Sequence, residues 1–306
     1  MFTLSRGGQQ VILLKHVDDC LLAATRGSDL LAYVSSELSK SYSLTTSTEP
    51  TNFVGFAISR DRANKSITIS QPHFVGSLID LYSIPPSTAK YPMAEDFLTS
   101  LETFSDILII SPSLQILYQE KVGNILYLAS HSRPDLMYST QLSRRSNKAT
   151  HKDMAAADRL LRYIASTADL ALTFCSHNDP SSLFAYVNSS YDCYSDSKSH
   201  SGISLHLGKH SGAFLFQTIT ADSSTVAEFV ATHSACQKTL FAHNLLTELN
   251  FLSSVPTTIR LILQKGNSGR TKHIALRYNM IRQCVKDNNI TIEYLPTDQM
   301  VPSPNL

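Results

Sequence analysis

Apolar residues in the first part of the chain follow the two-residue alternation that is typical of β-strands. Runs 11–14 and 20–23 flank the polar turn 17–19 and predict a β-hairpin whose tip carries two carboxylates. Runs 53–58 and 67–69 predict a second hairpin. Helical spacing of apolar residues follows each hairpin, so the segment 1–84 is predicted to consist of hairpins and helices.

The pattern changes over residues 85–117, where four prolines with Ser and Thr beside them interrupt the periodicity. We expect a linker or a loosely packed strap there. Helical spacing returns over residues 118–169, and Thr150 is placed to cap a helix whose apolar residues share one face. This second segment is predicted to be a helical connection.

From residue 170 onward, four strand-like runs are followed by a helix, a strand, a helix and a strand. This order predicts a mixed β-sheet with helices packed on it, in a domain that covers residues 170–306. The chain as a whole is therefore predicted to have an α+β or mixed fold. The four strand-like runs are 170–174, 183–187, 203–207 and 213–218.

Charge and composition narrow the classes of protein that the chain can represent. Lys and Arg number 26 against 25 Asp and Glu, and this net charge of +1 excludes a polycationic nucleic-acid binder but not a local basic face. Apolar runs are too short for a membrane span or a signal peptide, so we expect an intracellular protein, cytoplasmic or nuclear and not secreted. The five scattered cysteines are expected to be buried thiols.

Two features could carry chemistry on their residues alone. Asp18 and Asp19 at a hairpin tip could hold Mg²⁺, which prefers oxygen ligands, although paired aspartates also suit a solvated turn. Glu228 lies near the start of a predicted helix, where a glutamate is ordinarily a solvated surface residue. No glycine-rich phosphate loop and no GxSxG element is present in the sequence.

A series of short blocks resembles the C-terminal part of Ty1/copia-type retrotransposon Pol polyproteins, almost from end to end and in the family's order. The hairpin block Val11-Ile-Leu-Leu-Lys-His-Val-Asp-Asp19 is similar to a strand that ends in Tyr-Val-Asp-Asp, with His16 in place of the tyrosine. Two further blocks, Ser132-Arg-Pro-Asp135 and Leu160-Leu-Arg-Tyr163, resemble "TRPD" and "ILRYL". The remaining similar blocks are 53–61, 67–71, 91–93, 122–129, 223–229 and 270–274.

The resemblance implies a truncated reverse transcriptase palm over 1–84, a strap over 85–117, a helical connection over 118–169 and a ribonuclease H-like domain over 170–306. It implies RNA-directed DNA polymerase and RNA–DNA hybrid ribonuclease chemistry with Mg²⁺, carried by Asp18, Asp19 and Glu228 as catalytic and metal-binding residues. It also implies binding to an RNA–DNA hybrid, DNA or RNA. The candidate phosphate contacts are Arg144, Arg145, Arg270, Lys272 and His273, although the net charge of +1 favours solvated faces for both basic clusters.

The chain also departs from the family at the positions that carry the chemistry. The polymerase site needs a further aspartate from an upstream strand, and we expect it to be absent. In the ribonuclease H-like half, Asn188 and Ser190 stand at the two aspartates of the family's first strand, and Gln264 and Pro302 align with two more acidic positions. Of the four metal-binding positions on this alignment, which are Asn188, Glu228, Gln264 and Pro302, only Glu228 is acidic.

Three hypotheses follow from these matches and departures. We favour a degenerate, catalytically inactive fragment whose apolar pattern has outlasted its active sites, because apolar residues of roughly the right size suffice to fold a chain. An active Mg²⁺-dependent hybrid nuclease, with substitute ligands, is the first alternative. A non-catalytic nucleic-acid-binding protein is the second, and in each case a missing part of Pol could act in trans.

Overall fold

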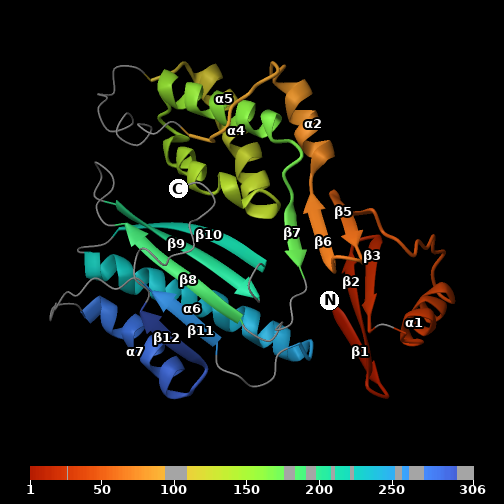
Figure 1. Ribbon diagram of the computed structural model, residues 1–306. Helices are drawn as coiled ribbons and strands as arrows, with labels where there is room; N and C mark the ends of the chain where they lie inside the picture. The colour runs from red at the N-terminus through yellow and green to blue at the C-terminus, as the bar shows by residue number, and fades with distance from the viewer. Residues whose placement is uncertain are drawn as a thin grey trace.

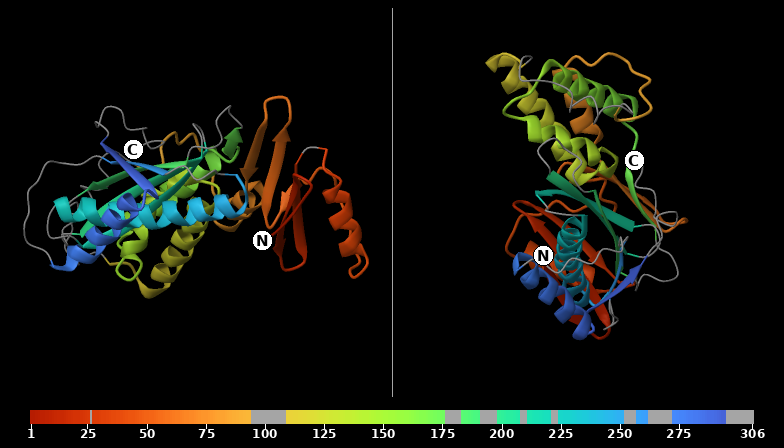
Figure 2. Two further views of the ribbon diagram at one scale, coloured as in Figure 1. Left: turned by 90° about the horizontal axis from the view of Figure 1, so that it is seen from below. Right: turned by 90° about the vertical axis from the view of Figure 1, so that its left-hand side faces the viewer.

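A computed structural model describes residues 1–25, 27–93, 109–175, 183–190, 198–207, 211–220, 224–251, 257–261 and 272–294 (Figure 1). Three sheets and the helices around them confirm the predicted mixed α and β class. The first sheet and the helix that follows it lie at one end of the molecule, and the last helix lies at the other (Figures 1 and 2). Within the described residues, no helix is both long and apolar enough to cross a membrane.

The first sheet is antiparallel and has the order β1 (Phe2–Arg6), β2 (Gln9–His16), β3 (Asp19–Ala24). The predicted hairpin is confirmed as β2 and β3, in which His16 pairs with Asp19 across a two-residue turn. β1 was not predicted, and it is joined to β2 by a turn at two glycines with positive φ. Helix α1 (Leu30–Ser39) contacts β2 and β3, and its first amide donates a hydrogen bond to the Ser28 hydroxyl.

The second sheet has the order β4 (Asn52–Phe53), β5 (Phe56–Asp61), β6 (Ser66–Ser70), β7 (Leu172–Cys175). Strands β5 and β6 form the second predicted hairpin. Sequence analysis places the run 170–174 in the C-terminal domain, but in the structure β7 pairs with β6. The strand thus closes a sheet whose other members lie about a hundred residues earlier in the sequence.

The helical unit consists of α2 (Pro72–Leu81), α4 (Pro112–His131), the 3₁₀ helices η2 (Pro134–Leu136) and η3 (Tyr138–Arg145), and α5 (His151–Ser166). It holds the largest described core, which includes Tyr118, Leu128, Leu160 and Ile164, each almost fully buried. Helix α4 begins at Pro112, behind a Ser111 cap, so the end of the expected strap is helical. Within the predicted helical segment 118–169, the residues from Pro134 to Arg145 form the two 3₁₀ helices and not an α-helix.

Strands β8 (Leu183–Ser190), β9 (Lys198–Leu207), β10 (Ser211–Thr220), β11 (Thr257–Leu261) and β12 (Ile290–Tyr294) form a sheet in the order β10-β9-β8-β11-β12. The first three are antiparallel, and β11 runs parallel to β8 and β12, as expected for a mixed sheet. Helices α6 (Ser224–Glu248) and α7 (Lys272–Lys286) lie together on one face (Figures 1 and 2). Their core against the sheet contains Val187, Ile203, Ile259, Ala231 and Ile281.

The expectation that the cysteines are buried thiols holds for two of the four that the structure describes. Cys236 on α6 and Cys284 on α7 are buried, and burial raises the pKa of the Cys236 thiol to about 12. Cys20 on β3 is exposed and Cys175 on β7 is half-buried, because each lies on a strand that no helix fully covers.

Candidate functional site

The tip of the β2–β3 hairpin presents Asp18 and Asp19 to solvent. Asp18 lies in the turn and Asp19 is the first residue of β3, where it pairs with His16. Both carboxylate residues are exposed. Val17, beside them, has φ of 49°, in the left-handed region that a β-branched residue rarely adopts. The turn of this hairpin is therefore strained and differs from the common two-residue turn of Asn and Gly, which adopt positive φ readily.

The donor set at the tip meets only part of what a two-metal site needs. Mg²⁺ is usually held by one or two carboxylates together with water and substrate phosphates, so Asp18 and Asp19 suffice for a single weakly bound ion. Among the described residues, no group of three or more His, Cys, Asp or Glu side chains converges on a possible metal position. The hairpin alone therefore does not fit the pair of ions used in phosphoryl transfer.

Asn188 and Glu228 come from adjacent elements of the C-terminal unit. On β8, Leu183, Ala185 and Val187 are buried, and Val187 packs in the core that α6 and α7 share with the sheet. Because side chains alternate along a strand, Asn188 points to the opposite face, where it is exposed. Glu228 lies in the first turns of α6 and is half-buried.

The other positions expected to be degenerate are placed only in part. Ser190 is the last residue of β8, and its backbone pairs with His200 on β9. Gln264 and Pro302 lie outside the described residues. Of the four aligned ligand positions, the described parts of the chain therefore include Asn188 and Glu228.

The proposed phosphate-binding arginines lie at the end of η3, beside α5. Arg145 Nε is 3.4 Å from Asp153 Oδ2, and Asp153 is completely buried. The same oxygen accepts hydrogen bonds from the Thr150 backbone amide and hydroxyl, which form the predicted cap of α5. Arg145 is thus part of the internal support of a helix start, with about a third of its side chain exposed.

The remaining basic candidates are placed less completely. Arg144 lies next to Arg145 in η3 and is half-buried. Lys272 and His273 begin α7, and Arg270 lies outside the described residues. Phosphate binding by these two clusters stays a prediction.

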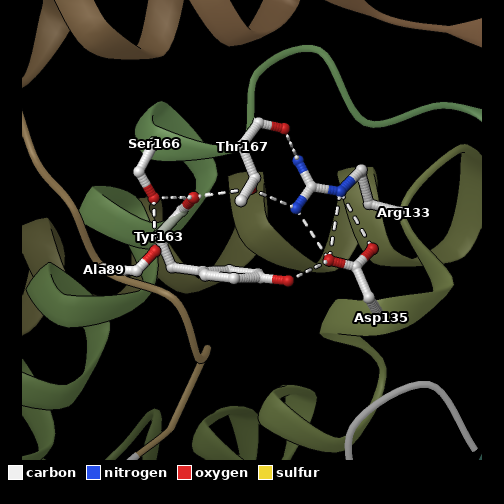
Figure 3. Close-up of polar contacts among 6 residues, drawn as sticks. All are labelled: Ala89, Arg133, Asp135, Tyr163, Ser166 and Thr167. Atoms are coloured by element: carbon white, nitrogen blue, oxygen red, sulfur yellow. Dashed lines mark hydrogen bonds and ion pairs between the residues drawn. The ribbon is translucent and has the colours of Figure 1, made fainter.

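A buried polar network links the turn after α4 to the end of α5, and sequence analysis gave it no role (Figure 3). Arg133 forms a bidentate ion pair with Asp135, with Nε 2.9 Å from Oδ1 and Nη2 2.7 Å from Oδ2. The Tyr163 hydroxyl donates to Asp135 Oδ2 at 3.1 Å. Arg133 also donates to the Thr167 carbonyl and hydroxyl, at 3.0 and 2.8 Å.

The side chains in this network are well shielded from water. Arg133 and Asp135 are 3% and 12% exposed, so the pair is held in a low-dielectric setting. Burial, together with the adjacent Asp135, raises the pKa of Tyr163, which therefore stays a hydrogen-bond donor. Arg133, Asp135 and Tyr163 fall in the two blocks 132–135 and 160–163, and the presence of both blocks was the available sequence signal; Thr167 lies outside them.

A second buried polar group lies on the face of the C-terminal sheet that α6 does not cover. His206 on β9 stacks on Phe184, with ring centroids 5.2 Å apart, and meets Tyr186 edge-on. Its Nε2 is 2.5 Å from the Ser204 hydroxyl. Burial lowers the pKa of His206.

The chain combines this fold and the acidic hairpin with sequence blocks similar to those of retroelement Pol proteins. Comparison with known proteins confirms this similarity in sequence. No protein family model matches the chain. The chain is 29% identical over 98% of its length to the retrovirus-related Pol polyproteins from transposons RE2 and RE1 of Arabidopsis thaliana, covering 21% of each. It is 24% identical over 94% of its length to the corresponding polyprotein from transposon TNT 1-94 of Nicotiana tabacum.

These matches establish that the chain is related in sequence to Ty1/copia-type retrotransposon Pol polyproteins. The chain spans about a fifth of the length of the curated relatives it matches. The activities of a complete Pol polyprotein therefore come to this chain only as proposals.

Proposed function

We propose that the chain is a degenerate reverse transcriptase and ribonuclease H fragment that keeps a folded scaffold and has lost catalysis. The relationship to retrotransposon Pol polyproteins supports the origin. The mixed five-stranded sheet with α6 and α7 on one face is compatible with a ribonuclease H-like unit. The acidic β2–β3 hairpin is compatible with part of a polymerase palm.

The observation that carries the proposal is Asn188. It occupies the position on β8 where the motif alignment expects a metal-bridging aspartate, and it is exposed on its face of the sheet. An amide offers a neutral oxygen in place of a carboxylate and so supplies no charge to a bridging ligand. Two-metal hydrolysis needs ions ~3.5–4 Å apart, and their mutual repulsion must be offset by carboxylates.

The polymerase half supports the same conclusion. A two-metal polymerase site takes aspartates from more than one strand. β1, the strand that pairs with β2 on the side away from β3, contains no acidic residue. Asp18 and Asp19 are therefore the only carboxylates that the three strands of this sheet and their hairpin turn contribute.

Loss of catalysis is compatible with retention of the fold, because the groups involved are different. The candidate metal ligands are polar residues that are exposed or half-buried, whereas the scaffold depends on buried apolar ones such as Tyr118 and Leu160. Binding to an RNA–DNA hybrid, or completion of the palm by another part of Pol in trans, would add a function that does not need the lost carboxylates.

Primer extension tests the polymerase part of the proposal. The purified chain, with an RNA template, a DNA primer and Mg²⁺ or Mn²⁺, is expected to give no template-dependent product. An Asp18→Asn variant serves as the matched control because its charge change is confined to the exposed turn. Incorporation by the natural chain that disappears in Asp18→Asn would contradict the proposal, since it requires a complete metal site.

A further inference from the structure

Three helix ends meet where the block 132–135 crosses the helical unit. Ser132 is the C-terminal cap of α4, Gln71 is the N-terminal cap of α2, and Thr167 is the C-terminal cap of α5. The Ser132 hydroxyl donates to Gln71 Oε1 at 2.7 Å, and both residues are buried. The next residue, Arg133, holds the carbonyl and the hydroxyl of Thr167 (Figure 3). Two consecutive residues therefore form hydrogen bonds to the ends of two other helices.

Both of these helix ends adjoin, along the chain, a member of the strand pair β6 and β7. Gln71 follows Ser70, the last residue of β6. Leu172, the first residue of β7, follows Thr167 by five positions, a span of at most about 18 Å. The antiparallel register pairs Ile69 with Leu172, so the end of β6 and the start of β7 adjoin each other.

The strand pair has little of its own to hold it in register. β7 has four residues, none of them buried, and β6 has none buried either. The hydroxyls of Thr68 and Thr173 lie 3.4 Å apart across the pair, but the two residues are 105 positions apart in the sequence. Closing a loop of that length carries an entropy cost, and a one-residue slip would turn every side chain to the other face.

We propose that Ser132 and Arg133 form a bracket that delivers β7 to β6 and fixes their register, so that opening of this junction is controlled from inside the helical unit. The bracket is the set of hydrogen bonds from Ser132 to Gln71 and from Arg133 to Thr167. Asp135 and Tyr163 complete it by aligning the guanidinium, whose positive charge also suits the C-terminal end of α5. This role is independent of any activity on nucleic acid.

The ion pair is suited to setting geometry and less suited to adding stability. A buried ion pair adds little stability over apolar packing because both charges lose their hydration. The planar guanidinium of an arginine, however, restricts the directions in which its hydrogen bonds can form. The Lys121–Asp158 ion pair lies between α4 and α5, and the other groups near the Lys121 ammonium, Met154 Sδ and the Tyr82 ring, belong to neither β6 nor β7. It therefore provides a control ion pair in the same unit, with one partner, Asp158, 43% exposed.

Hydrogen exchange on the full chain tests the bracket, with peptides that cover β6, β7, α4 and α5. The variants are Arg133→Lys, which keeps the charge and loses the fork, Ser132→Ala, which removes the arm to Gln71, and Thr167→Val, which removes one acceptor. Each is expected to lower protection in β6 and β7 about tenfold, while α4 changes less than threefold. Lys121→Met is expected to lower protection in α4 and α5 and to change β6 and β7 no more than the helices.

Two results would overturn the proposal. One is that β7 keeps the protection of the natural chain in both Ser132→Ala and Thr167→Val, which leave the ion pair in place. The other is that β7 and α4 lose protection in the same ratio in the bracket variants as in Lys121→Met. Should Arg133→Lys fail to fold, the first comparison still decides, because the two neutral variants keep the Arg133–Asp135 ion pair. Ser132→Ala removes the hydrogen bond to Gln71, and Thr167→Val removes the hydroxyl's bonds to Arg133 and to the Tyr163 carbonyl.

Discussion

The helical unit and the N-terminal sheet differ in how much of each is buried. In the helical unit, residues from α2, α4, η2 and α5 form one core, with Leu128, Leu136, Leu160 and Ile164 fully shielded from solvent. In residues 1–50, apart from position 26, which the structure leaves undescribed, only Val11 and Leu30 are buried. The carboxylates of the hairpin thus lie on a part of the molecule in which few described residues are buried. Apolar pattern and chemical competence are maintained by separate residues, so one can persist without the other.

The largest expected difference between the two regions is the loss of unfolding free energy when one apolar residue in each is truncated. Leu160→Ala removes a fully buried side chain and is expected to lower the free energy of unfolding by about 2–5 kcal/mol. Leu14→Ala, in a residue that is 40% exposed, should lower it by less than about 1 kcal/mol. Chemical denaturation measures both. Equal losses would show that the N-terminal sheet has a core that these contacts do not reveal.

Hydrogen exchange of the natural chain compares the sheets without mutation. Amides of β1 to β3 are expected to exchange about a hundredfold faster than those of β8 and β11, since β8 and β11 border a buried core and all five residues of β1 are exposed. Peptide-level exchange at neutral pH provides the measurement. Similar protection in the two sheets would contradict the view that the N-terminal sheet is incompletely covered.

Helix starts in the two regions offer a smaller contrast. Thr150→Ala removes a hydroxyl that bonds both the backbone and the carboxylate of buried Asp153, and we expect a loss of about 1–2 kcal/mol. Ser28→Ala removes the hydroxyl that accepts from the Leu30 amide at the start of α1, where its surroundings are only half-buried. Its expected cost is about 0.5 kcal/mol. A larger loss in Ser28→Ala, measured by thermal unfolding, would reverse the ranking of the two regions.

Among the described histidines, the two with shifted pKa values lie in the C-terminal unit, and their effect on stability should be small. Burial lowers the pKa of His206 and His233 below the ordinary value of 6.5 in the folded state. As the pH falls below about 6.5, the unfolded chain therefore binds more protons than the folded chain does. Their contribution to stability is complete above about pH 6.5 and is lost as the pH falls through the folded-state values. His206→Gln should flatten the slope of stability between pH 7 and 5, with exposed His73→Gln as control. An unchanged slope in His206→Gln would contradict this assignment.

The sequence predicts local elements better than it predicts their partners. Alternation around Val17 and around Asn64 is sufficient to locate two hairpins, because strand period and turn chemistry are local properties. The pairing of β7 with β6 was missed because nothing in a four-residue run indicates which of two sheets it joins. The Thr150 cap was predicted because its partners lie within three residues. The Arg133 network was not, because Thr167 lies 34 positions away.

For the candidate site, the sequence predicted which residues could take part, but not the contacts that tertiary packing gives them. Asp18 and Asp19 were expected at a hairpin tip, and the structure places them there. The participation of Arg145 in an ion pair with Asp153 depends on the packing of η3 on α5, which no local pattern encodes. The orientation of Asn188 away from α6 follows from strand parity once Val187 is known to face the core.

Cleavage of a labelled RNA–DNA hybrid in Mg²⁺ tests the central claim, that the scaffold persists without a working metal site, most directly. The natural chain, Asn188→Asp and Glu228→Gln are compared at equal concentration, after circular dichroism shows that all three are folded. We expect no cleavage by any of them, because restoring one carboxylate at Asn188 leaves the two-metal set incomplete. Robust cleavage by the natural chain that is abolished in Glu228→Gln would contradict the account and establish an active nuclease with replacement ligands.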